Sequence, residues 1–150
     1  MKIARWFGIV ALLLVAAGCG GPRGTTPAAQ PKGDGVHWQT NFVQALKQAK
    51  QEGKPVLVDV MASWCEPCKR LQREVWSRPD VGELSKSFVP VQVDADLDRD
   101  VRTKLGANSY PTTIFLSPEG TEIERVLAAV PYEDMLKAMQ GVLDKMKASK

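Results

Sequence analysis

Hydrophobic and polar residues follow regular patterns from about residue 36 onward, and these patterns predict helices and strands. The nearly continuous apolar run at 55–61 is typical of a strand covered on both faces, whereas 122–128 alternates between apolar and polar residues. The predicted order is helix 41–52, strand 55–61, helix 69–76, strand 88–94, helix 96–105, strand 112–117, strand 122–128 and helix 132–147. Strands separated by helices predict parallel pairing, and the turn at 118–121 predicts an antiparallel hairpin. We therefore expect an α/β domain whose central mixed sheet is flanked by helices.

The first and last predicted helices each carry an apolar face that should pack on this sheet. Asn41 can cap the first helix together with Gln44, Gly53 is typical of the position just past a helix end, and Pro79 predicts a break after 69–76. The apolar face of the first helix consists of Phe42, Val43, Ala45, Leu46 and Ala49, and that of the last helix of Met135, Leu136, Met139, Val142, Leu143 and Met146.

The first residues of the chain have a different pattern, a positive start followed by an uncharged apolar stretch. Lys2 and Arg5 precede the stretch from Trp6 to Gly18, which is shorter than the roughly 20 residues of a membrane-spanning helix and typical of a signal peptide. Residues 15–19, VAAGC, resemble a bacterial lipobox, and this resemblance implies cleavage after residue 18 and lipidation of Cys19. The alternative is an ordinary secretory peptide, which would leave Cys19 as a free thiol.

The next segment is rich in glycine and proline and contains no large apolar residue. It cannot bury a core, so we expect a flexible tether. The predicted organisation is a lipoprotein signal peptide at 1–18, a lipidated cysteine and tether at 19–35, and one folded domain at 36–150. We expect this domain outside the cytoplasm, held by its lipid on the periplasmic face of a bacterial membrane. Because Gly20 rather than an aspartate follows Cys19, the outer membrane is favoured where the organism has one.

Composition narrows the class of protein. The chain is 44% hydrophobic and 25% charged, as is ordinary for a soluble globular domain. Its formal net charge of +3 includes Lys2 and Arg5, so the remaining chain is nearly neutral. A nearly neutral domain lacks the basic surface of a nucleic-acid-binding protein, and we expect no nucleic acid among its partners.

Cys65 and Cys68 stand in SWCEPCK, residues 63–69, between the buried strand and the next helix. A structural zinc site needs four ligands, and with Cys19 lipidated only these cysteines and His37 remain as Cys or His ligands. A permanent disulfide across so few residues would restrict little chain entropy. Redox exchange is favoured over both, because a helix N-terminus stabilises a thiolate. Cys65, nearest the helix start, is then expected to be the exposed nucleophile, with Cys68 placed to attack the mixed disulfide.

These residues are part of a wider resemblance to the thioredoxin family. The matching stretches are VLVD at 56–59, Ala62, WCEPCK at 64–69 and YPT at 110–112, and the resemblance runs from about Trp38 to the C-terminus. The stretches 37–38, 52–55 and 74–76 resemble the extracytoplasmic branch of the family, which includes the C-terminal domain of the periplasmic transmembrane disulfide reductase. The resemblance implies a thioredoxin-like fold for the domain.

The resemblance also implies roles for the catalytic residues. Cys65 would attack a substrate disulfide, Cys68 would resolve the mixed disulfide, and Asp59 would take or relay the proton of Cys68. Elementary physics agrees for Asp59, because burying a carboxylate in an apolar strand disfavours its charged form and raises its pKa toward the range of a proton shuttle. A hydrogen-bonded structural aspartate at the end of the strand is the alternative.

A second set of residues is implied to bind the substrate: Trp64, Tyr110, Pro111 and Thr112. Pro111 would be in the cis form, leaving the Tyr110 backbone free to pair with an extended substrate segment as in strand addition. For Trp64, plain packing is the alternative role.

Three residues depart from the family pattern or bear on the direction of electron flow. Pro90 stands about where cytoplasmic thioredoxins carry a buried lysine near the acid, so proton handling is expected to differ. Strong oxidants of the family have a histidine before the second cysteine, where this chain has Pro67. Glu66 adds a negative charge that disfavours the Cys65 thiolate, a bias of about 20 mV toward the reducing side.

The sequence therefore predicts a thiol–disulfide oxidoreductase that reduces disulfides of cell-envelope proteins, without an organic cofactor or a metal. The Cys65–Cys68 pair would be recharged by a transmembrane electron donor, and we expect a monomer. A disulfide oxidase or isomerase is the alternative enzyme. An interaction module whose cysteines no longer react is the non-enzymatic alternative.

Overall fold

A four-stranded sheet forms the centre of the computed structural model, which describes residues 34–149. The strands are β1 (Val56–Met61), β2 (Val89–Asp94), β3 (Thr112–Leu116) and β4 (Glu122–Leu127), and they lie in the order β2-β1-β3-β4. β1 and β2 pair in parallel, while β3 is antiparallel to both β1 and β4. The mixed sheet of an α/β domain is thus confirmed.

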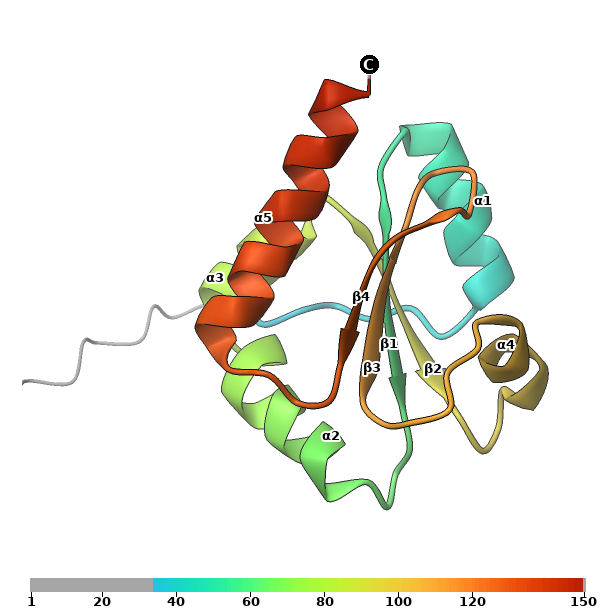
Figure 1. Ribbon diagram of the computed structural model, residues 1–150, viewed down its shortest axis with the longest axis vertical. Helices are drawn as coiled ribbons and strands as arrows, with labels where there is room; N and C mark the ends of the chain where they lie inside the picture. Colours follow the sequence, from blue (N-terminus) through green and yellow to red (C-terminus); the bar gives the residue numbers. More distant parts are fainter. Residues whose placement is uncertain (1–33, 150) are drawn as a thin grey trace, which may run out of the picture.

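Helices cover both faces of this sheet (Figure 1). On one face lie α1 (Phe42–Glu52) and α4 (Arg99–Lys104), and on the other lie α2 (Glu66–Leu71), the π-helical turn η1 (Gln72–Trp76), α3 (Pro79–Ser85) and α5 (Tyr132–Ala148). The predicted caps of α1 are confirmed. The Asn41 side chain accepts a hydrogen bond from the Gln44 backbone N–H, and Gly53 ends the helix with a φ of 63°.

The core has two layers because the side chains of β1 alternate between the faces of the sheet. Val56, Val58 and Val60 pack in the layer that contains α1, and Leu57 packs in the layer that contains α5. Asp59 follows Leu57 by two residues, so its side chain points to the same face as Leu57. A carboxyl group is thereby placed under α2 and η1, within an otherwise apolar layer.

The direction of β3 differs from the parallel pairing that an intervening helix predicts. The six residues of α4 span about 9 Å, less than the roughly 20 Å length of a six-residue strand, and the rest of the connection between β2 and β3 forms turns instead of extending back along the sheet. The chain therefore re-enters the sheet at the end where β2 left it. β3 consequently runs antiparallel to β1, and its first residues lie beside the last residues of β1.

Two further expectations need correction. Val43 is 72% exposed and does not belong to the buried face of α1, because the apolar stripe is narrower than the sequence pattern indicates. Pro79 does not simply end a helix; it occupies the first turn of α3, where its missing N–H leaves no bond unmade. The cysteine-containing helix also begins earlier than expected, at Glu66, and its final turn is the π-helical turn η1.

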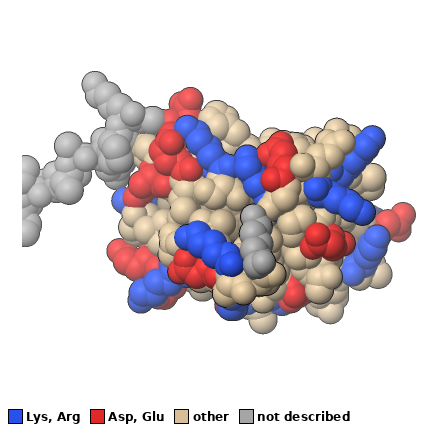
Figure 2. Space-filling model, turned by 90° about the horizontal axis from the view of Figure 1, so that it is seen from above, with Lys and Arg blue, Asp and Glu red and all other residues tan. Residues whose placement is uncertain are grey.

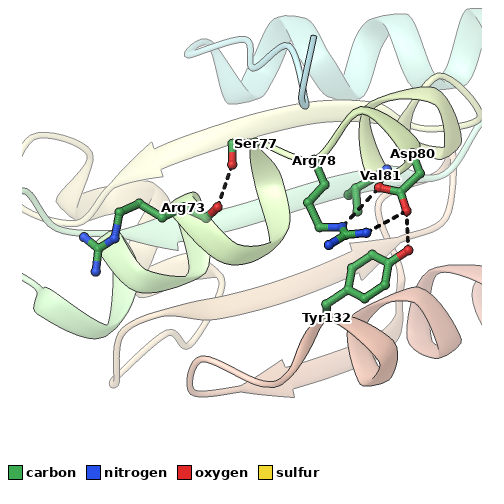
Figure 3. Close-up of polar contacts among 6 residues, drawn as sticks. All are labelled: Arg73, Ser77, Arg78, Asp80, Val81 and Tyr132. Carbon is green, nitrogen blue, oxygen red and sulfur yellow. Dashed lines mark hydrogen bonds and ion pairs between the residues drawn. The ribbon is translucent and has the colours of Figure 1, made fainter. Parts of the chain in front are cut away.

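A polar cluster joins the start of α3 to the start of α5 (Figure 3). The Arg78 guanidinium donates to both Asp80 carboxylate oxygens, over 3.2 and 3.4 Å, and stacks 3.7 Å from the centre of the Tyr132 ring. The Tyr132 hydroxyl and the Val81 backbone N–H also donate to Asp80. The Asp80 carboxylate thus accepts from three different residues, so we assign this cluster a structural role.

Charges of both signs are mixed on the face at which α5 ends, as Figure 2 shows. Within residues 34–149 no helix is both long and apolar enough to cross a membrane. The predicted signal peptide at 1–18, the tether of 19–35 except its last two residues, and the lipidation site Cys19 lie outside the described residues.

Candidate active site

Cys65 and Cys68 form a disulfide at the junction of β1 and α2, with their Cα atoms 5.3 Å apart. Cys65 is the N-cap residue of α2, and its backbone N–H donates to the carbonyl of Ala62 over 3.0 Å. Pro67 is accommodated in the first helical turn. The Cys68 backbone N–H points back to Cys65 Sγ over 3.2 Å, so a thiolate at Cys65 would accept a hydrogen bond from the helix.

Neither cysteine is exposed, which corrects the expectation that Cys65 projects into solvent. Cys65 is 4% and Cys68 6% accessible. Both residues pack in the apolar layer that contains α1, and Tyr110 packs against the same layer. A partner disulfide must therefore come into close contact with the surface around Cys65 before the sulfur atoms can react.

Asp59 is buried at 3% exposure, near the middle of the sheet. Its Oδ2 accepts a hydrogen bond from Gln92 Nε2 over 2.9 Å, and Gln92 stands directly opposite Asp59 in the pairing of β1 with β2. Burial raises the pKa of Asp59 to about 6, although Gln92 and the Trp76 indole lower it in part. The carboxyl group can thus exchange a proton close to neutral pH.

Asp59 and Cys68 line the same cavity, which has a volume of about 400 Å³. Within residues 34–149 no hydrogen bond joins the Asp59 and Cys68 side chains directly, so a proton would pass between them through water. Gln92, Met61 and Trp38 form further walls of this cavity. The arrangement brings the predicted proton acceptor to the predicted resolving cysteine.

Trp64 is 65% exposed beside the disulfide, and two contacts fix the orientation of its ring. Its indole Nε1 donates to Asp96 Oδ2 over 2.8 Å, and the Tyr110 ring lies edge-on at 6.1 Å between centroids. An exposed aromatic ring with a fixed orientation can bind an apolar part of a partner at little entropic cost.

The peptide bond between Tyr110 and Pro111 is cis. The Tyr110 hydroxyl accepts a hydrogen bond from Arg102 Nη1 over 3.1 Å, and the Pro111 carbonyl accepts one from the Ala128 N–H. Within residues 34–149 the Tyr110 backbone N–H and carbonyl have no backbone partner, as strand addition by a substrate would need. The Thr112 side chain is fully buried and donates to the Ser109 carbonyl over 2.7 Å, so it can influence a partner only through the shape of this loop.

The negative charge of Glu66 does not act alone. Its carboxylate oxygens lie 3.5 Å from Lys69 Nζ and 3.7 Å from Arg73 Nη1, and all three side chains are at least half exposed. Two cations therefore offset the negative charge of Glu66, which we predicted from the sequence to disfavour the Cys65 thiolate. Within the described part of the chain no group of three His, Cys, Asp or Glu side chains is arranged to hold a metal ion.

Sequence reasoning missed three residues that contact the predicted site residues. Gln92 bonds to Asp59 and Asp96 bonds to Trp64, while Trp76 approaches Asp59 from η1. The only signal for Gln92 was its polar side chain within an otherwise apolar strand. Nothing in the sequence indicates that residues 72–76 form a π-helical turn.

Comparison with known proteins agrees with this geometry. Residues 42–143 match the model of a family described as a thioredoxin-like domain. The chain is 39% identical over 83 residues to the thiol:disulfide interchange protein DsbD of Klebsiella pneumoniae, which covers 53% of this chain and 14% of that protein. It is 33% identical over 96 residues to a thioredoxin H-type of Fagopyrum esculentum, which covers 62% of this chain and 77% of the relative.

A solved structure gives the same result at the level of the fold. The solution structure of a thioredoxin from Thermus thermophilus superposes with a TM-score of 0.68 at 26% identity, covering 77% of this chain and 92% of that one. The chain spans only a small part of the DsbD protein that it matches.

Proposed function

This chain belongs to the thioredoxin-like family of thiol–disulfide oxidoreductases, and we propose that it reduces disulfides of cell-envelope proteins through Cys65 and Cys68. The observation that carries this proposal is the placement of the cysteine pair at the start of α2, with Cys68 and the buried acid Asp59 on one cavity. A disulfide with a purely structural role would need neither the cavity nor the acid.

The first step is attack by Cys65. In the reduced protein the Cys65 thiolate, hydrogen-bonded by the Cys68 N–H, attacks one sulfur of a partner disulfide. A new S–S bond joins Cys65 to the partner while the partner disulfide breaks. The second partner sulfur leaves as a thiolate and takes a proton from water.

The second step is resolution by Cys68. Asp59 in its carboxylate form takes the Cys68 proton through the shared cavity, and the Cys68 thiolate attacks Cys65 Sγ of the mixed disulfide. The Cys65–Cys68 disulfide forms, and the partner leaves with its remaining sulfur as a thiolate, which is protonated by water. Two electrons pass from the protein dithiol to the partner.

The partner docks, in this proposal, on the surface that surrounds Cys65. Trp64 supplies an exposed ring with a fixed orientation, and the unpaired backbone groups of Tyr110 can hydrogen-bond an extended segment of the partner. Pro111 and Thr112 shape the loop that presents Tyr110.

The location and the electron source are part of the same proposal. Lipidation of Cys19 would anchor the domain outside the cytoplasm, near disulfide-containing envelope proteins, and the outer membrane is favoured where there is one. The domain would act as a monomer. A transmembrane electron donor would reduce the Cys65–Cys68 disulfide after each turnover. Similarity to the DsbD protein, whose name describes thiol:disulfide interchange, supports this class of reaction.

Trapping of mixed disulfides tests the proposal. With Cys68→Ala the second step is blocked, so envelope proteins should accumulate as reducible adducts at Cys65. The matched control is the double variant Cys65→Ala, Cys68→Ala, which should trap none. Equal recovery from both variants, or no adduct from an oxidised envelope extract, would contradict dithiol exchange.

A further inference from the structure

Four buried side-chain atoms of residues 34–149 have no hydrogen-bond partner of good geometry, and all four lie at or near Asp59. They are Asp59 Oδ1, Thr113 Oγ1, Trp38 Nε1 and Trp76 Nε1. Thr113 stands opposite Asp59 in the pairing of β1 with β3, and Trp38 lines the same cavity as Asp59. The Trp76 ring lies edge-on to Trp38, 5.3 Å away. An unpaired buried polar group costs about 1–3 kcal/mol, so their concentration at one place indicates a function rather than chance.

The cavity beside these atoms is large enough to hold several waters, since one water occupies about 30 Å³ in the liquid, and Asp59 and Gln92 supply polar groups to its wall. It leads from Asp59 and Cys68 to the exposed side chains of Lys69, Gln72 and Arg73. Trp64, Tyr110 and Pro111 do not line it.

The resolving step proposed above moves the Cys68 proton to Asp59 through this cavity, and we propose that Gln92 is the positioning residue that holds the Asp59 carboxyl group for that transfer. The inference rests on the dithiol exchange proposed above. It adds a residue of β2 to the site, one that acts on the resolving step only through Asp59.

The proton balance of the resolving step follows this route. Water in the cavity carries the proton from the Cys68 thiol to Asp59 Oδ1, the carboxylate oxygen without a hydrogen-bond donor of good geometry. As the Cys68 thiolate bonds to Cys65 Sγ, the partner thiolate leaves. Asp59 then returns its proton to water at the mouth of the cavity, and the site is ready for the next reduction.

The groups that face Asp59 favour a carboxyl that changes charge. Of the neighbouring elements, β2 contributes Gln92, β3 contributes Thr113 and the segment before α1 contributes Trp38, none of them ionisable. From α2 and η1 the ionisable groups are Cys68, Lys69 and Arg73, and the two cations lie beside Glu66. The raised pKa of Asp59 has burial as its main cause and no contribution from a charged side chain.

The amide of Gln92 suits this task better than a cation would. An amide N–H can donate to Asp59 Oδ2 whether the carboxyl is ionised or neutral, so it fixes the orientation of the group without fixing its charge. A buried lysine at this position would hold the carboxylate ionised and oppose its protonation. Gln92 therefore keeps Oδ1 directed to the cavity through both halves of the proton transfer.

The experiment separates the two chemical steps with the aromatic disulfide dithiobis(nitrobenzoate). The reduced protein releases one thionitrobenzoate when Cys65 attacks and a second when Cys68 resolves, and stopped-flow absorbance follows both phases between pH 5 and pH 9. Wild type is compared with Gln92→Leu, Asp59→Asn and the double variant. Gln44→Leu, the same replacement at an exposed position of α1, is the matched control.

We expect Gln92→Leu to slow the second phase about threefold or more near pH 6.5 and to shift its pH profile upward, leaving the first phase unchanged. In the Asp59→Asn background, Gln92→Leu should have no further effect, because the group that it positions is gone. Gln44→Leu should match wild type.

Two results overturn the inference while leaving the proposed function intact. One is a pH profile for the second-phase rate of Gln92→Leu that coincides with that of wild type. The other is an equal loss in the presence and absence of Asp59, which would mean that Gln92 is merely structural. If wild type itself releases no second thionitrobenzoate, the proposed dithiol exchange fails, and this inference fails with it.

Discussion

Asp59 and Asp80 both accept hydrogen bonds from other side chains, yet their pKa values are shifted in opposite directions. Asp80 accepts hydrogen bonds from Arg78, Tyr132 and Val81, and although partial burial alone would raise its pKa, these donors lower it (Figure 3). Asp59 has one hydrogen-bond donor with good geometry, Gln92, and an unpartnered Oδ1, and burial raises its pKa to about 6. A carboxylate with a full set of donors stabilises the fold, whereas one with too few donors is available for proton transfer.

The largest expected effect of this difference is on the exchange reaction. Asp59→Asn removes the proton acceptor of Cys68, so the resolving step should slow by at least about tenfold at pH 7. Asp80→Asn leaves the site untouched and should not change this step. Stopped-flow measurement of the second thionitrobenzoate release checks both, and equal rates for the two variants would remove the distinction.

The second expected effect is on stability, where Asp59→Asn should stabilise the protein at neutral pH. The folded pKa of about 6 lies above the ordinary value of 3.8, so ionising Asp59 costs folding free energy as pH rises from 3.8 to 6. Above pH 6 the full cost is about 3 kcal/mol, which the amide avoids. Urea unfolding at pH 8 and pH 4 measures it: the variant should be more stable at pH 8 and close to wild type at pH 4.

A smaller effect of opposite sign is expected at Asp80. Asp80→Asn weakens the bonds to Arg78 and Tyr132, and should destabilise the protein by about 1 kcal/mol at pH 7, because the cluster is partly exposed. The lowered pKa means that this stability is present above the ordinary value of 3.8 and is lost as pH falls through the folded pKa. A stability gain in the same urea series would show that the cluster is not the structural support described.

The smallest effect is expected at a third carboxylate, Glu66, which lies next to Cys65 but is exposed. Its charge is offset by Lys69 and Arg73, so Glu66→Gln should shift the reduction potential of the cysteine pair by less than about 20 mV. Redox titration of wild type and variant compares the potentials. A shift of several times this size would mean that distance to Cys65 matters more than burial.

The features of the site that could be predicted from the sequence are those set by residues close together in the chain. The placement of Cys65 and Cys68 at a helix start followed from the local sequence, whereas the role of Asp59 and the cis form of Pro111 were implied by the resemblance of short motifs to the thioredoxin family. The mixed sheet followed from the hydrophobic pattern. These features depend on residues that are close in sequence, and they could be predicted.

The remaining features depend on residues that are far apart in sequence. The bond between Gln92 and Asp59 exists because β1 and β2 pair in one register, and a shift of one residue would turn Gln92 to the opposite face. Trp76 approaches Asp59 from η1, a π-helical turn that no local pattern marks. The direction of β3 depends on the whole connection between β2 and β3. Its helix α4, Arg99–Lys104, is shorter than the helix predicted at 96–105. None of these could be predicted from local patterns.

The most direct test of the central claim, that the protein is a reductase, is the reduction potential of the Cys65–Cys68 pair in the intact chain. Equilibration with glutathione or dithiothreitol buffers, followed by alkylation and mass measurement, gives its value. A reductase should have a potential below about −200 mV, in the range of thioredoxins and glutaredoxins. A potential well above this value would contradict the account, because the protein would then accept electrons from envelope thiols rather than donate them.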